Sequence, residues 1–137
     1  MSVRIDFTYN GELRCSATHA PSQTVLLTDA PVDNQGKGES FSPTDLVATA
    51  LGSCILTTMA IFAKRRDIEL RGASATVHKE MISTPSRRIG KLTAEIRLPF
   101  PPSHPMRETL ERVGLTCPVH ASLHPDMEQQ IDFQWVG

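Results

Sequence analysis

The sequence predicts an α+β fold in which antiparallel strands surround one long buried helix, and two observations support this prediction. First, residues 46–63 carry no charge, so a helix formed there has no face suited to water. Second, segments of alternating apolar and polar residues lie on both sides of that run, a pattern typical of strands with one buried face. A chain of 137 residues has the length of one domain, so we expect a single domain over residues 1–137.

The first half of the chain begins with a predicted hairpin. Val3, Ile5, Phe7 and Tyr9 alternate with polar residues, and Asn10-Gly11 offers a turn into a second strand over residues 13–17. The sequence leaves its register open between two possibilities. A two-residue turn pairs Phe7 with Arg14, whereas a three-residue bulged turn pairs Phe7 with Cys15. A third strand over residues 23–29 and a loop over residues 30–41 follow.

The central helix is predicted over Ser42–Lys64. Ser42 can act as its N-cap, Pro43 suits the first helical position, and Asp45 can close a capping box. Such an apolar helix must be wrapped by protein or by lipid, and its internal Thr, Ser and Gly residues favour protein. A chain of this length has too few residues to cover the helix on every side by itself. We therefore expect a homodimer, in which a second copy completes the shell.

The second half of the chain is predicted to contain strands and two short helices. The expected elements are a strand over residues 69–81, a strand over residues 92–98, a helix from Met106 ended by Gly114, a short helix with Thr116 as its N-cap, and a closing strand over residues 131–135.

Composition excludes several classes of function. Fourteen basic residues balance fifteen acidic ones, so there is no basic surplus for binding nucleic acid. Residues 1–30 contain no signal-peptide pattern, and we expect neither export nor a membrane span. Three cysteines are too few for a disulfide framework. We therefore expect reduced thiols and a cytoplasmic location.

Cys54 and Cys117 are the candidate reactive residues. A thiol is only a few per cent ionised at neutral pH unless a cation, a helix N-terminus or hydrogen bonds favour the thiolate. Cys54 lies deep in its helix, while Cys117 begins one, so local electrostatics favour Cys117 as the more acidic thiol. The alternative is that Cys54 is a small buried hydrophobe and Cys117 an incidental thiol.

The segments SPTDLVATALGSC and CPVHASL resemble the OsmC/Ohr family, named for osmotically inducible protein C and organic hydroperoxide resistance. The order of elements fits from Val3 to Val136. This resemblance implies an OsmC-like intertwined homodimer of α+β subunits whose two long central helices pack together. It also implies a thiol peroxidase site at the subunit interface that needs no metal or flavin.

The resemblance assigns a role to three residues. It implies that Cys54 is the peroxidatic cysteine, which forms a sulfenic acid with an organic hydroperoxide, and that Cys117 resolves it as a transient disulfide. An external dithiol would then restore both thiols. Arg14 is the candidate cation. One residue departs from the family pattern, because Thr44 stands where the peroxidase branch has a glutamate that positions the arginine.

Two alternatives belong to other classes of function. Cys117, His120 and His124 are spaced for one helical face and, with Cys54, could bind zinc. The chain could also be a non-catalytic OsmC-like protein that holds a small apolar ligand in the interface cavity.

Overall fold

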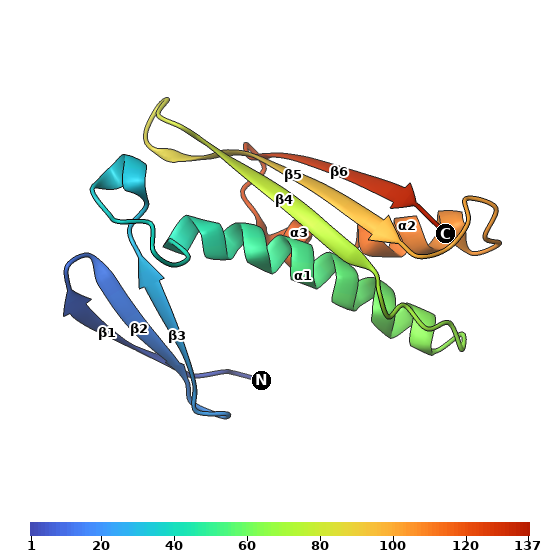
Figure 1. Ribbon diagram of the computed structural model, residues 1–137, viewed down its shortest axis with the longest axis horizontal. Coiled ribbons are helices and arrows are strands. Elements are labelled where there is room, and N and C mark those ends of the chain that lie inside the picture. The colour runs from blue at the N-terminus through green and yellow to red at the C-terminus, as the bar shows by residue number, and fades with distance from the viewer. The chain divides into compact units, whose positions relative to one another are not determined.

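The predicted central helix is present as α1, Pro43–Lys64, in a computed structural model that describes residues 1–137 (Figure 1). The α+β class is confirmed. The elements are β1 (Ile5–Gly11), β2 (Arg14–His19), β3 (Thr24–Asp29), a 3₁₀ turn (Val32–Asn34), α1, β4 (Ser74–Ile82), β5 (Arg88–Leu98), α2 (Arg107–Gly114), α3 (Pro118–Ser122) and β6 (Glu128–Trp135). They form two compact units, Met1–Leu46 and Val47–Gly137, each described by itself below. The single domain over residues 1–137 stays a prediction.

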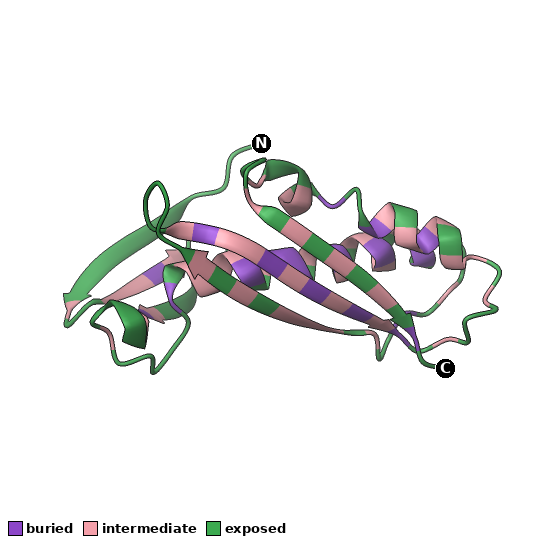
Figure 2. Cartoon of the chain, turned by 90° about the horizontal axis from the view of Figure 1, so that it is seen from above, coloured by how far each residue is buried: buried purple, intermediate pink, exposed green.

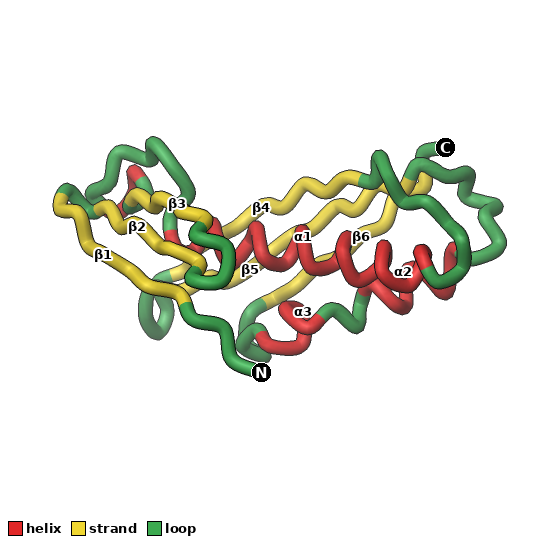
Figure 3. Tube along the Cα trace, turned by 90° about the horizontal axis from the view of Figure 1, so that it is seen from below, coloured by secondary structure: helices red, strands yellow, loops and turns green.

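The C-terminal unit contains a three-stranded sheet in the order β4-β5-β6. β4 and β5 are antiparallel, but β6 runs parallel to β5, so the sheet is mixed rather than wholly antiparallel. The reason is the connection, because α2 and α3 carry the chain back before β6 begins, as a parallel pair requires. Helices α1, α2 and α3 lie on one face of this sheet (Figure 3).

The core of the C-terminal unit lies between α1 and the sheet. Buried residues alternate along β5 (Figure 2), while α1 presents a buried stripe at helical spacing. Gly52 belongs to this stripe, and a Cβ at Gly52 would lie 3.0 Å from Val77 Cγ2 of β4. The fully buried side chains of this core include Leu51, Ile55, Met59, Leu92, Ile96, Leu98 and Leu110.

Only one side of α1 is buried within the chain. Thr49, Ser53, Thr57 and Ile61 recur every four residues and are all exposed. The expectation of a helix covered on every side is therefore not met by this chain alone. By length and composition α1 could also cross a membrane, a criterion that core helices of water-soluble proteins meet as well.

The N-terminal hairpin takes neither of the two predicted registers. Phe7 pairs with Ala17, a bulge follows Tyr9, and the chain turns at Glu12 and Leu13 instead of at Asn10-Gly11. Both turn residues have positive φ, 54° and 63°, as a type I′ turn requires. This register buries Ala17 beside Phe7 on one face of β2 and sets Arg14 on the other. Arg14 is then directly opposite Asp29 of β3, and the opposite charges attract across the strands.

The predicted capping box at the start of α1 is confirmed. The Asp45 backbone N–H donates to Ser42 Oγ over 3.1 Å, and the Ser42 backbone N–H donates to Asp45 Oδ2 over 2.9 Å. Two otherwise unpaired donors at the helix N-terminus are thereby satisfied.

Replacing Ser42 with Ala removes one half of this capping box. We expect Ser42→Ala to lower the free energy of unfolding by about 1 kcal/mol. Urea denaturation at one fixed protein concentration measures this change. The matched control is Ser74→Ala at an exposed position of β4, which should stay within about 0.5 kcal/mol of the original protein. Equal stability of the two variants would contradict the role of the cap.

Candidate functional site

The two candidate cysteines meet in the C-terminal unit. Cys54 lies on α1 next to the fully buried Ile55 and is itself half-buried. Because Ile55 is anchored in the core, the direction of the neighbouring Cys54 side chain is fixed as well. Cys117 precedes α3 and is fully buried. A hydrogen bond between the two thiols contributes to the pKa of each, so the two sulfur atoms lie close together.

Cys117 is the N-cap of α3. Its sulfur accepts a hydrogen bond from the His120 backbone N–H over 3.2 Å, and Pro118 occupies the first turn. The prediction that Thr116 caps this helix is wrong. Thr116 Oγ1 instead donates to the carbonyl oxygen of Val113 over 2.6 Å, so its hydroxyl serves the end of α2.

The surroundings of Cys54 favour its thiolate. Burial raises the pKa of the Cys54 thiol, but hydrogen bonds from the Val119 backbone N–H, the Cys117 thiol and the Thr58 hydroxyl lower it. The net result is a pKa below the ordinary value of a cysteine. Thr58 lies one helical turn after Cys54, with 3.9 Å between Oγ1 and Sγ. Hydrogen bonds to the charged form therefore outweigh desolvation at this thiol.

The pKa of the Cys117 thiol changes in the opposite direction. Burial raises it first; the His120 and Val119 backbone N–H groups oppose that, while the hydrogen bond and the charge of Cys54 raise it further. The net pKa lies above the ordinary value. The expectation that Cys117 is the more acidic thiol is therefore wrong. A partner that shares its proton with a neighbouring thiolate holds that proton more tightly.

Arg14 belongs to the N-terminal unit, where it lies between two carboxylates. Its Nη2 atom is 3.4 Å from Asp29 Oδ2 and 2.6 Å from Glu39 Oε1. Asp29 is 1 % exposed and also accepts the Glu39 backbone N–H over 3.0 Å, whereas the Glu39 side chain is 58 % exposed. The sequence did not predict Asp29 as a partner of Arg14. Asp45 serves the helix start, as expected.

The chain contains no group of three or more His, Cys, Asp or Glu side chains arranged to hold a metal ion. His120 Nδ1 hydrogen-bonds to Gln129 Oε1, and His124 Nδ1 accepts the Asp126 backbone N–H. The zinc alternative therefore has no ligand set in this structure, although Cys54 and Cys117 do meet.

The roles of several residues around the thiol pair were not predicted from the sequence. Thr58 could have been found, because positions four apart on a helix lie on the same face. Val119 and His120 act through backbone N–H groups, which leave no sign in the residue types. Gln129 reaches this region only through the pairing of β6 with β5.

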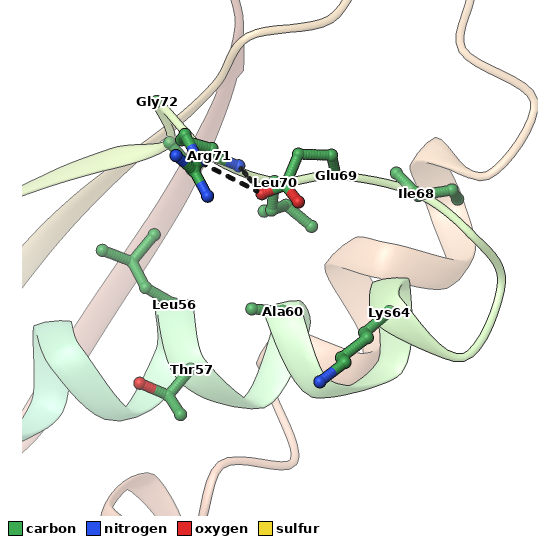
Figure 4. A pocket seen from close by; sticks show the side chains of 10 residues that line it. Leu56, Thr57, Ala60, Lys64, Ile68, Glu69, Leu70, Arg71 and Gly72 are labelled. Atoms are coloured by element: carbon green, nitrogen blue, oxygen red, sulfur yellow. Dashed lines mark hydrogen bonds and ion pairs between the residues drawn. The ribbon is translucent and has the colours of Figure 1, made fainter.

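A pocket of about 520 Å³ lies beside the C-terminal half of α1 (Figure 4). Leu56 and Ala60 face the segment that joins α1 to β4, and an ion pair between Arg71 and Glu69 lies on that segment. Cys54 does not line the pocket. It is therefore a feature separate from the thiol pair.

Comparison with known proteins identifies relatives over most of the chain. The family described as OsmC-like protein matches residues 36–132. No curated protein matches the chain. A solved Psychrobacter arcticus structure, provisionally named an osmotic stress induced and detoxification response protein, is 42 % identical with a TM-score of 0.88. The match covers 98 % of this chain and 96 % of that one.

Two more distant structures share the fold. An organic hydroperoxide resistance protein OsmC from Legionella pneumophila is 13 % identical, with a TM-score of 0.78 and coverage of 98 % of this chain and 97 % of that chain. An organic hydroperoxide resistance protein from Elizabethkingia anophelis is 14 % identical, with a TM-score of 0.74 and coverage of 99 % and 97 %.

Removing Cys117 tests how the thiol pair sets the acidity of Cys54. In Cys117→Ala the Cys54 thiolate loses a hydrogen-bond donor, so its pKa should rise and alkylation by iodoacetamide at pH 7 should slow. The alkylation rate as a function of pH gives the pKa, because the rate rises through the pKa and then levels off. Cys15→Ala, in the N-terminal sheet, is the control and should leave the Cys54 profile in place. A Cys54 pKa that is unchanged or lower in Cys117→Ala would contradict this account.

Proposed function

Because this chain belongs to the OsmC-like protein family, we propose that it is a thiol-dependent peroxidase that reduces organic hydroperoxides. The observation that carries the proposal is the hydrogen-bonded pair of Cys54 and Cys117, in which Cys54 has the lower pKa. Two relatives of the same fold are named organic hydroperoxide resistance proteins, which supports the choice of substrate.

The reaction has two oxidative steps, after which a reductant regenerates the two thiols. The Cys54 thiolate attacks the outer oxygen of ROOH, the O–O bond breaks, and the alkoxide leaves as ROH after taking up a proton. Cys54 is then a sulfenic acid. The Cys117 sulfur attacks the Cys54 sulfur, a disulfide forms, and water leaves. An external dithiol supplies two electrons and two protons, which restore both thiols.

The unequal pKa values suit this division of roles. The first step needs a thiolate, and hydrogen bonds from Val119, Cys117 and Thr58 favour one at Cys54. The second step needs a thiol that stays reduced until Cys54 is oxidised, and the raised pKa of Cys117 keeps it protonated. After the first step the negative charge on Cys54 is gone, and with it one cause of that raised pKa.

Arg14 is proposed as the cation that binds the peroxide oxygens. An arginine donates several hydrogen bonds in a fixed geometry and stays charged at all relevant pH values. The family resemblance supports this choice. Asp29 and Glu39 take part in holding Arg14, in place of the family glutamate that Thr44 replaces.

A homodimer is part of the proposal. Ile5, Phe7 and Tyr9 share one face of β1 and are 48 %, 70 % and 63 % exposed. Three-stranded sheets need an apolar face covered to be stable in water. The exposed side of α1 likewise carries no charge over Thr49, Ser53, Thr57 and Ile61. A second copy would cover both surfaces. A reducing compartment such as the cytoplasm is also part of the proposal, and the free thiols support it.

Binding of a small ligand without catalysis is the second candidate function. The pocket beside α1 favours it, since Leu56, Ala60, Ile68 and Leu70 offer an apolar lining and Lys64 adds a cation. A protein of this kind would form no disulfide on exposure to peroxide.

Thiol counting under anaerobic conditions tests the peroxidase proposal. One equivalent of cumene hydroperoxide should remove two thiols per chain, and mass mapping should find a link between Cys54 and Cys117. Cys15 should remain free and serves as an internal control. Loss of no thiol, or oxidation of Cys15 alone, would reject the proposal and favour ligand binding.

Replacing Arg14 tests the proposed cation. Arg14→Met removes the donors to the peroxide oxygens, and we expect thiol oxidation to slow about 100-fold, the cost of losing a positioned donor to developing charge. Stopped-flow measurement of oxidation at several peroxide concentrations gives this rate. Arg4→Met, which removes an exposed arginine paired with Asp6, is the matched control and should react at the original rate. Equal rates for both variants would exclude Arg14 from the site.

A further inference from the structure

Gln129 is a polar residue on the core-facing side of β6. It pairs with the fully buried Leu92 of β5 and shares its face with Ile131 and Phe133, which pack against the core. A strand face in contact with the core normally carries apolar residues, because an amide buried without partners costs free energy. The half-buried amide of Gln129 therefore needs hydrogen-bond partners, and both of its polar atoms have one.

Both partners of the Gln129 side chain belong to His120 of α3. Gln129 Nε2 donates to the His120 carbonyl oxygen over 3.3 Å, and Gln129 Oε1 lies 2.5 Å from His120 Nδ1. A carbonyl oxygen can only accept, so the amide nitrogen must face it and the amide oxygen must face the ring. His120 Nδ1 therefore carries a proton and donates it. This two-point contact survives protonation of the ring, because Nδ1 donates in both forms.

His120 connects this contact to the thiol pair. Its backbone N–H donates to Cys117 Sγ, and the preceding Val119 N–H donates to Cys54 Sγ. Helix α3 has only five residues, too few to hold a position through its own hydrogen bonds. Contacts with the rest of the unit must therefore fix the direction of both N–H groups. The side-chain amide of Gln129 hydrogen-bonds to His120, the residue whose backbone N–H donates to Cys117.

We propose that Gln129 is a positioning residue for the thiol pair, which it serves by holding the His120 peptide so that the first turn of α3 directs its N–H groups at both sulfur atoms. This inference rests on the proposed function for its catalytic consequence, since the resolving step requires Cys117 to be in place. Its effect on the acidity of Cys54 does not depend on that function.

The test compares Gln129→Met with Gln130→Met. Methionine has the length of glutamine but neither hydrogen bond. Gln130 is the next residue of β6; it is exposed and hydrogen-bonds to Asp132, so it controls for a loss of polarity on the same strand. Asparagine is one methylene group shorter than glutamine, so Gln129→Asn moves the amide away from His120. This variant is used if Gln129→Met does not fold.

The first measurement is the rate of iodoacetamide alkylation of Cys54 as a function of pH. We expect the pKa of Cys54 to rise in Gln129→Met and to stay in place in Gln130→Met. An unchanged Cys54 pKa in a folded Gln129→Met or Gln129→Asn protein would overturn the inference. A fall in thermal stability without this shift would mean that Gln129 is structural only.

The second measurement is the product of one turnover with cumene hydroperoxide in the presence of dimedone, which traps sulfenic acid. Slower resolution leaves the Cys54 sulfenic acid exposed for longer. We expect the ratio of dimedone adduct to Cys54–Cys117 disulfide to rise about tenfold in Gln129→Met, equivalent to about 1.4 kcal/mol. An unchanged ratio would overturn the inference. If the unmodified protein forms neither product, the proposed function fails, and the alkylation profile still decides the role of Gln129.

Discussion

The packing of α1 against the sheet is the contact on which the rest of the C-terminal unit depends. Leu51, Ile55 and Met59 are fully buried and fix the rotation of the helix about its axis. Each of these side chains contributes about 1.5–3 kcal/mol through its removal from water. Rotation of the helix would expose all three at once, so the direction of Cys54 is held by the core rather than by any polar contact of its own.

The pKa values of Cys54 and Cys117 differ because different hydrogen-bond donors surround the two thiols. Cys54 accepts hydrogen bonds from three donors, whereas Cys117 gives one of those bonds and is more deeply buried. Desolvation opposes both thiolates, but only at Cys54 do the donors outweigh it. Two chemically identical thiols thus have different pKa values because Cys54 accepts more hydrogen bonds than Cys117. Neither a bound metal nor the dipole of a long helix is needed to explain the difference.

Sequence patterns predicted those features that depend on local residue types. The capping box of Ser42 and Asp45, the extent of α1 and the alternation along β5 all follow from short-range spacing. The hairpin register was missed because the chain turns at Glu12 and Leu13 with positive φ, a conformation that these residue types do not predict, and because a bulge follows Tyr9. The acidity order of the cysteines was missed for a related reason. It is set by backbone N–H groups of α3, whose direction follows from tertiary contacts and not from residue identity.

The contacts of Arg14 show which carboxylates can position it although residue 44 is a threonine and not a glutamate. Asp29 is buried and is itself held by the Glu39 backbone N–H, so it sets the position of the guanidinium group. The Glu39 side chain is mostly exposed, and an exposed ion pair contributes only about 0–1 kcal/mol. If Arg14 binds the peroxide as proposed, the peroxide would displace the Glu39 carboxylate at small cost while Asp29 keeps its contact with the arginine. In the proposed site, the acid that positions Arg14 would come from β3 instead of the start of α1, so a threonine at residue 44 does not leave Arg14 without a carboxylate partner.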